Sequence, residues 1–385
     1  MASDARFVRR ESRRSKKPIF QDAKLLLYVA VVAAISIACY WRPSQDDFDR
    51  YVYEALIRSS KQPIGEIYGI VKHESPRAES SSVMDSPDHL AQLEPLYAIR
   101  PMYLELTGLV NRLGIPPQKA INSISAASLF LIALLAYAAT RNYLYAFLLM
   151  ASPSVIIVGR LGGPDAVSSM AVAAACVVVL RKKLFAGVLL LMVSVWIRTD
   201  NVLIVLVVLG WLAWNQQLKK VHAGVLSLVA VASVEWINTL SGNYGWKVLL
   251  HYSFIGGKYP AEIKSGISFV QYLRTFAVNL ESLFPQLALW VLLALAAWKL
   301  RHPDRAFLVP VAIACALHYL LFPSAEGRYF TWAYLMTGIL FIGAIANLRS
   351  LPSFNSSGDN DYRTDEAFGL EGNDDPRVSA RVFGT

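Results

Sequence analysis

Charged side chains are scarce in this chain. Asp, Glu, Lys and Arg make up 17% of its 385 residues, and apolar residues make up 55%. A soluble domain of ordinary composition is about 25% charged and about 45–50% apolar. The shortage of charge therefore excludes an ordinary soluble domain and favours a protein that is largely surrounded by lipid.

Cysteine is also scarce. Cys39, Cys176 and Cys315 each lie inside an apolar run and form no spaced framework. Isolated cysteines in such surroundings usually behave as small hydrophobic residues. They therefore give no information about the redox compartment.

The apolar residues are gathered into runs of roughly 14–21 residues, a length that approaches or reaches the thickness of a bilayer. The sequence predicts an all-α polytopic membrane protein with about ten transmembrane helices. The predicted spans are 25–41, 120–140, 143–158, 165–180, 184–197, 202–214, 221–240, 283–299, 306–322 and 329–346.

The basic residues set the expected orientation of these spans. Eight Lys or Arg precede residue 25, and the short loops at 141–142, 181–183, 216–220 and 299–305 are basic. Basic loops stay in the cytoplasm, so both termini are expected there. Although the net charge is +9, this distribution serves membrane topology, and no nucleic-acid partner is expected.

The remaining segments divide the chain into three parts. Residues 1–24 are basic and 347–385 are acidic and rich in Gly, Ser and Asn, and both are expected to be disordered in the cytoplasm. Residues 25–346 form the membrane domain, with large outer loops at 42–119 and 241–282. Amphipathic helices are expected in the first loop, over "FDRYVYEALIR" and "LYAIRPMYLELTGLVNRLG", whereas 72–90, rich in Ser and Pro, is expected to be mobile.

Unusual polar residues collect at the outer ends of the spans. They stand in "QDDFDRY", "AIRPMY", "GRLGGPDA", "WIRTDN" and "SAEGRYF". Each segment taken alone is compatible with a simple interface anchor. Because charges at span ends are costly unless they pair or line a wet cavity, five such segments on one side predict a site at the outer face.

"WIRTDN" lies between two short apolar runs. A continuous buried helix would place Arg198 and Asp200 in hydrocarbon, at about 2.5–3.5 kcal/mol each. We therefore expect an outward hairpin that brings both residues near the lipid headgroups.

Arginine matches phosphate oxygens with two parallel hydrogen bonds, and a facing carboxylate can act as a general base. The outer residues thus predict a site for a lipid phosphate, at which a sugar is transferred to an acceptor hydroxyl. The candidate phosphate-site residues are Arg100, Arg160, Asp165, Arg198, Asp200, Arg328 and Tyr329. Capping of a helix is assigned to Asp46 or Asp49, and His318, inside a predicted span, is interpreted as a satisfied interior histidine.

The layout resembles the integral-membrane glycosyltransferases of the GT-C fold, including the bacterial lipid-A aminoarabinose and protein O-mannosyl transferase types. In that family a motif Asp-[Glu/Asp]-x-x-Tyr-x-x-x-Ala follows the first helix. Asp47, Tyr51 and Ala55 stand at these spacings, but Phe48 takes the place of the second acid, and Asp46 precedes the motif. The resemblance therefore implies that Asp47 or Asp46 is the catalytic base.

The resemblance also implies the substrate and the location. Such enzymes transfer a sugar from a polyprenyl-phosphate donor to a lipid, glycan or protein acceptor, mostly with inversion. They often need no cofactor, and the resemblance leaves open whether a divalent metal is required. A bacterial plasma membrane, with the site facing the periplasm or exterior, is the expected location.

The alternative hypothesis is a transporter or flippase of lipid-linked intermediates. Such a protein should carry polar residues near the membrane midplane and inverted repeats with broken helices. The polar residues of this chain lie on one side, and no internal repeat is visible. The enzyme is therefore the favoured reading.

Overall fold

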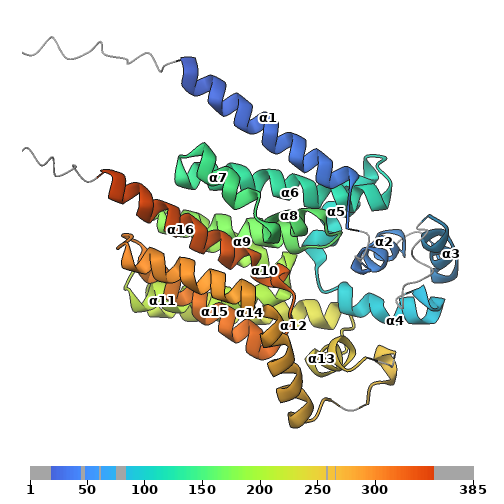
Figure 1. The fold of residues 1–385 in the computed structure, drawn as a ribbon. Helices are drawn as coiled ribbons and strands as arrows, with labels where there is room; N and C mark the ends of the chain where they lie inside the picture. The colour runs from blue at the N-terminus through green and yellow to red at the C-terminus, as the bar shows by residue number, and fades with distance from the viewer. Residues whose placement is uncertain are drawn as a thin grey trace, which may run out of the picture.

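The computed structural model describes residues 19–44, 48–59, 62–74, 84–256, 259–264 and 266–350. Within these ranges all of the regular secondary structure is helical, and no strand is present (Figure 1). The all-α expectation is therefore confirmed for the described residues. The helices are α1 (Ile19–Trp41), α2 (Asp49–Ser59), α3 (Ile64–Glu74), α4 (Pro87–Tyr97), α5 (Pro101–Arg112), α6 (Pro117–Thr140), α7 (Tyr143–Met150), α8 (Pro153–Arg160), α9 (Asp165–Leu180), α10 (Leu184–Ile197), α11 (Val202–Trp214), α12 (Lys220–Leu240), α13 (Trp246–Phe254), α14 (Phe269–Lys299), α15 (Leu308–Leu321) and α16 (Thr331–Ser350).

Many of these helices are apolar enough to lie in a membrane. Helices α1, α6, α12, α14 and α16 are each long enough to cross one, and α7 and α8 together make a sixth candidate that is bent by 59°. Four shorter apolar helices lie at 165–180, 184–197, 199–214 and 305–321. These lengths and compositions are those of a multi-pass helical membrane protein.

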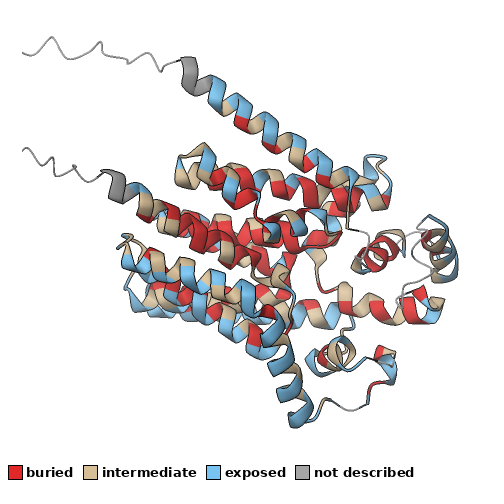
Figure 2. Cartoon of the chain, viewed as in Figure 1, coloured by how far each residue is buried: buried red, intermediate tan, exposed pale blue. Residues whose placement is uncertain are grey.

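The most buried part of the bundle is formed around α9. Small residues line this helix, and its contact with α10 is close because Gly187 has no side chain. A Cβ at Gly187 would lie 2.5 Å from a methyl group of Val179 and 3.1 Å from the carbonyl oxygen of Ala175. Small residues permit such close packing of helices in membranes. Figure 2 shows that burial is concentrated in this region, whereas much of α14 is exposed.

The outer loops form a separate layer at one end of the bundle. Helices α2, α3, α4 and α13 lie there, opposite the end where α1 begins and α16 ends (Figure 1). The two loops touch through His89 of α4, which stacks on Tyr259 with ring centroids 4.3 Å apart. The oxygen of Tyr252 also lies 3.3 Å from Nε2 of His89.

The ends of the membrane domain differ from the expected boundaries. Helix α1 begins at Ile19 and α16 ends at Ser350, so the adjoining residues 19–24 and 347–350 are helical and were wrongly expected to be disordered. Residues 1–18 and 351–385 lie outside the described residues, and the expectation of disorder there stays a prediction.

Candidate functional site

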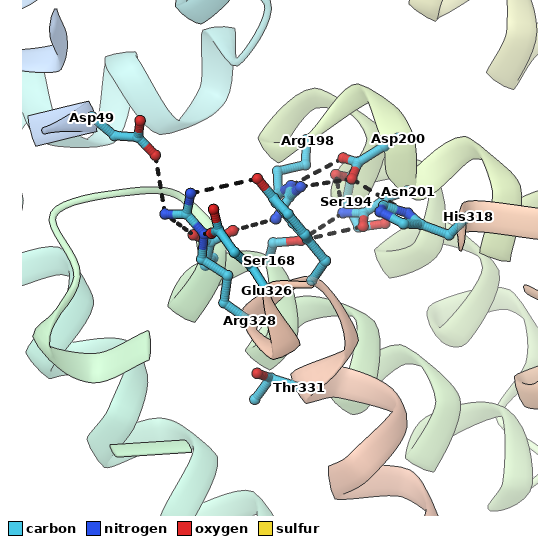
Figure 3. A network of polar contacts seen from close by, with 12 residues as sticks. Asp49, Ser168, Ser194, Arg198, Asp200, Asn201, His318, Glu326, Arg328 and Thr331 are labelled. Carbon is cyan, nitrogen blue, oxygen red and sulfur yellow. Dashed lines mark hydrogen bonds and ion pairs between the residues drawn. The ribbon is translucent and has the colours of Figure 1, made fainter. Parts of the chain in front are cut away.

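A network of ion pairs lies where the outer layer meets the bundle. Figure 3 shows its members converging from the beginnings of α2 and α9, the connection between α10 and α11, the end of α15 and the turn before α16. The charged residues are Asp49, Asp165, Arg198, Asp200, Glu326 and Arg328, with His318 beside them.

Arg198 holds one half of the network together. Its guanidinium forms ion pairs with Asp165 and with Asp200, the latter through two hydrogen bonds of 3.0 and 2.7 Å. The guanidinium carbon also lies 4.8 Å from the ring centroid of Tyr329. Arg198 and Asp165 are both buried, with relative side-chain exposures of 8% and 4%. Two carboxylates thus compensate one buried guanidinium.

Arg328 organises the other half. Its Nη1 lies 3.0 Å from Asp49 and 3.5 Å from Asp165, and its Nε forms an ion pair with Glu326. Asp165 therefore bridges the two arginines, because one of its oxygens faces Arg198 and the other faces Arg328. The network is continuous, so a change at one arginine is expected to reach the other.

Asp49 is the first residue of α2 and a member of this network. Its second oxygen accepts a 2.5 Å hydrogen bond from the Tyr97 hydroxyl. Burial by itself would raise the pKa of Asp49, but the charge of Arg328 and the Tyr97 hydrogen bond outweigh burial and hold that pKa below its ordinary value. Asp49 is therefore ionised at neutral pH.

Glu326 behaves differently from Asp49. Partial desolvation of its carboxylate raises the pKa of Glu326, and the charge of Arg328 only partly opposes this shift. Its side chain is 53% exposed, the highest value among the carboxylates of the network. Glu326 is therefore the partner that can leave Arg328 most easily.

His318 extends the network along α15. Its Nδ1 lies 3.6 Å from an oxygen of Asp200, and its Nε2 is buried without a hydrogen-bond partner among the described residues. The residue is interior, as expected, but it is not the fully satisfied histidine that was expected. Its contact with Asp200 was not predicted, because two residues in separate apolar runs show no spacing signal.

Local sequence explains why these side chains reach one place. Gly162 lets the loop before α9 approach α2, since a Cβ there would lie 2.9 Å from Arg50. Asp165 then occupies the first turn of α9, where an acid is favoured by the helix dipole.

The connection between α10 and α11 is fixed by Asn201. Its amide donates hydrogen bonds to the Ser194 carbonyl, at 2.9 Å, and to the Ser168 hydroxyl, at 2.8 Å. The Ser194 carbonyl also accepts the backbone N–H of Arg198, so Asn201 adds a second hydrogen bond to the last turn of α10. The break after Ile197 leaves the backbone of Arg198 extended, and its side chain pairs with Asp165. The expected position near the lipid headgroups stays a prediction.

Arg100 adjoins the network through aromatic rings. Its guanidinium carbon lies 5.3 Å from the ring centroid of Tyr97 and 5.6 Å from that of Tyr53. Its Nη1 is buried without a hydrogen-bond partner among the described residues. Arg100 is thus close to Asp49 through Tyr97 and keeps donor capacity.

Arg160 lies apart from the site. Its side chain is exposed, and its Nε donates a 2.9 Å hydrogen bond to the carbonyl oxygen of Arg42. It therefore fastens the end of α1 to α8. Of the seven predicted phosphate-site residues, the structure brings together Asp165, Arg198, Asp200, Arg328 and Tyr329, with Arg100 beside them.

The two predicted catalytic residues, Asp46 and Asp47, lie outside the described residues. They immediately precede Phe48 and Asp49, which line a cavity of about 440 Å³ together with Glu326 and Arg328. This polar cavity borders the network at Asp49, Glu326 and Arg328.

A second, apolar cavity of about 380 Å³ adjoins the polar one. Leucines of α14, Trp290, Cys315 and Tyr319 are among its lining residues. Ser154, Ile157, Gln286 and Gly327 line both cavities. The site therefore offers a charged compartment and an apolar compartment that meet at four shared residues.

Neither compartment offers a ready metal site. Within the described ranges, no group of three or more His, Cys, Asp or Glu side chains is arranged to hold a metal ion. Asp49, Asp165 and Glu326 each form an ion pair with the guanidinium of Arg328, which lies between the three carboxylates. These carboxylates therefore do not fit a resident divalent cation.

Comparisons with known proteins add no relative to this picture. No protein-family model, no curated protein and no solved structure gives a significant match to the chain. The residues of the site themselves must therefore carry the functional argument.

Proposed function

We propose that this protein is a membrane glycosyltransferase. It moves a sugar from a polyprenyl-phosphate donor to a lipid, glycan or protein acceptor at the extracytoplasmic face. The observation that carries the proposal is the pair of adjoining cavities, one lined by Arg328, Asp49 and Glu326 and the other lined by apolar side chains. A ligand with an anionic head and a long apolar chain matches both.

The volumes support a ligand of this kind. Cavities of roughly 300–1,000 Å³ are typical of small-molecule sites, and both compartments fall in this range. The polar one suits a sugar phosphate and the apolar one suits the first units of a prenyl chain. The exposed side of α14, which borders the apolar compartment, is where the rest of the chain would run in lipid.

The arginines are already paired, which shapes how a phosphate would bind. Arg198 is clamped by two carboxylates and Arg328 by three. A phosphate has to displace a carboxylate, and Glu326 is the one that leaves most easily. Arg328 would then stabilise the leaving phosphate through charge-assisted hydrogen bonds.

The chemical step is a displacement at the anomeric carbon of the sugar. A carboxylate, Asp47 or Asp46, takes the proton of the acceptor hydroxyl while the acceptor oxygen attacks that carbon. The bond from the anomeric carbon to the phosphate oxygen breaks, and the electron pair leaves with the polyprenyl phosphate. Attack from the side opposite the phosphate inverts the anomeric configuration.

The proposed topology places this site at the outer face. The five long helices, the bent pair and the four shorter apolar helices make ten apolar segments in all. We propose that each crosses the membrane with both termini in the cytoplasm. The network then lies outside, next to the headgroups of a bacterial plasma membrane.

A transporter of lipid-linked intermediates is the second candidate. The observation that favours it is the 59° bend between α7 and α8, since broken helices are common in transporters. The two functions differ in the fate of the donor, because an enzyme cleaves the sugar–phosphate bond and a transporter leaves it intact.

The test of the proposal is the glycan composition of the cell envelope. Deleting the gene should remove one sugar from an envelope lipid, glycan or protein, and wild-type protein should restore it. An Asp47→Asn variant that is expressed at wild-type level should fail to restore the sugar. Full restoration by Asp47→Asn and by Asp46→Asn would overturn the assignment of the base.

A further inference from the structure

Gln286 stands at the junction of the two compartments. It follows Pro285 within α14, its side chain is exposed, and it lines both the polar and the apolar cavity. It is neither charged nor part of any sequence motif. Its position is the reason to ask what its amide does.

The amide of Gln286 lies directly against the turn that carries Arg328. A Cβ added to Gly327 would lie 1.9 Å from Oε1 of Gln286 and 2.9 Å from its Cδ. Any side chain at position 327 would therefore push the amide away. The absence of a side chain at Gly327 keeps the Gln286 amide next to Arg328.

An uncharged hydrogen-bond donor suits a phosphate group at this junction. Arg328 already faces three carboxylates, so another cation is not needed, but the oxygens of an incoming phosphate need hydrogen-bond donors. A primary amide has two N–H donors and adds no charge. Beyond Gln286 the lining becomes apolar, with Leu283 and Trp290.

We propose that Gln286, held in place by Gly327, binds the phosphate of an amphiphilic lipid phosphate. The amide donates to a phosphate oxygen at the junction and so fixes the depth at which the head stops and the chain begins. This inference rests on the proposed function, because it deepens the recognition of the lipid-phosphate donor. It makes Gln286 a specificity determinant for phosphate over hydroxyl at the head of a prenyl chain.

Cys315 provides a readout of occupancy. It lines the apolar cavity and is partly exposed, whereas Cys39 and Cys176 are buried. The full-length protein in lipid nanodiscs is exposed to a photoactivated diazirine, whose carbene does not need an ionised thiol, and labelling of Cys315 is followed by mass spectrometry. Farnesyl phosphate, farnesol and inorganic phosphate are titrated as competitors.

Wild-type protein should be protected by farnesyl phosphate at a lower concentration than by farnesol. Inorganic phosphate, which has no chain to cover Cys315, should leave it reactive. Protection by inorganic phosphate equal to that by farnesyl phosphate would overturn the lipid assignment. Equal protection by farnesyl phosphate and farnesol, or by neither, would overturn the proposed function and this inference together.

Three variants then test the role of Gln286 itself. A hydrogen bond to a charged group contributes enough that its loss weakens binding about tenfold or more. Gln286→Leu should reduce the preference for farnesyl phosphate by about that factor and leave farnesol binding unchanged. Gln286→Glu keeps the size but repels the phosphate, so its preference should fall further.

Gly327→Ala displaces the amide without removing it and should reproduce the effect of Gln286→Leu. The matched control is Gly210→Ala, since a Cβ at Gly210 would meet nothing within 4 Å. A different outcome is that the wild-type protein prefers farnesyl phosphate to farnesol while Gln286→Leu and Gln286→Glu keep the same preference. That result would overturn the role of Gln286 and leave the proposed function standing.

Discussion

Replacing Arg328 by Met is the perturbation whose effect on stability follows most directly from the structure. Asp49 and Glu326 would each lose an ion pair, and Asp165 would keep only Arg198. Breaking a buried pair from one side costs about 3–5 kcal/mol, because a charge is left without a partner. Asp49 is 29% exposed and retains Tyr97, so we expect a loss near the lower limit, about 3 kcal/mol.

The assay is thermal unfolding of the purified protein in detergent or nanodiscs at pH 7.5. An unfolding entropy of about 2 cal/mol/K per residue gives about 1.2 °C per kcal/mol for a chain of 385 residues, so a loss of about 3 kcal/mol corresponds to a fall in Tm of roughly 4 °C. Adding Asp49→Asn to Arg328→Met removes one of the stranded charges and should recover part of the lost stability. The pair of variants thus measures the coupling of Arg328 to Asp49.

Arg160→Met is the matched control. Arg160 was predicted to belong to the same site, but its side chain is exposed and contacts the carbonyl of Arg42. Its replacement should change stability by no more than about 0.5 kcal/mol. If Arg328→Met melts within about 1 °C of Arg160→Met, the network does not hold the outer layer to the bundle and the reasoning is refuted.

Three further predictions concern pH, packing and catalysis. Asp49 has a lowered pKa in the folded protein, so its contribution to stability is present above about pH 4, the pKa of an unfolded Asp, and is lost as the pH falls through the lower folded pKa. The Tm difference between wild type and Asp49→Asn should therefore shrink only below about pH 4. A Tm difference that stays constant down to about pH 2 would contradict this. Gly187→Ala should destabilise the protein by about 1–3 kcal/mol, because its new methyl group meets the backbone of α9. Equal Tm values for Gly187→Ala and Gly210→Ala would show that α9 and α10 are not in close contact. Asp46 and Asp47 immediately precede Phe48 and Asp49 of the polar cavity. The variant Asp47→Asn should lower the rate of sugar transfer by at least about a hundredfold, and Asp46→Asn is the comparison. An unchanged kcat in both variants would show that neither residue takes part in the reaction.

The apolar helices could be predicted well because lipid leaves a strong signal in composition. Each of the ten predicted runs is helical, with 143–158 divided between α7 and α8. The start of α14 could not be predicted from hydropathy. Residues 269–282 include Arg274 and Glu281, which interrupt the apolar run, although Ser268 and Gln271 form a capping box that marks the helix start.

The outer layer also contains a helix start that composition alone does not reveal. The stretch 72–90 reads as a mobile loop because it is rich in Ser and Pro, and its residues 75–83 lie outside the described part of the chain. Ser86 nevertheless caps α4 by accepting a hydrogen bond from the His89 N–H, with Pro87 at the first helical position. This Ser-Pro signature was available in the sequence.

Side-chain partners in the site were harder to predict than their general location. Topology alone brings Asp165, Arg198 and Arg328 to one face, and the structure joins them in one network. Asp49 and His318 were assigned structural roles because their partners lie in distant segments, and no local spacing records a contact between them. Gln286 was missed for the same reason.

The pairing of the arginines was also not predictable from residue types. Four arginines predicted on one face suggest side chains that are free to bind phosphate, yet Arg198 and Arg328 are compensated by carboxylates of the same chain. The network is therefore a cluster of mutually compensated charges where α2 meets the bundle. Under the proposed function, a phosphate has to displace one of these carboxylates.

Cleavage of a polyprenyl-phosphate sugar by the purified protein tests the central claim most directly. The donor is supplied in nanodiscs with an envelope extract as acceptor source, and free polyprenyl phosphate is measured by mass spectrometry. The account predicts that wild-type protein releases polyprenyl phosphate as the sugar appears on an acceptor, and that Asp47→Asn does not. Passage of the intact donor across a vesicle bilayer, with no polyprenyl phosphate released, would contradict the account and identify a transporter.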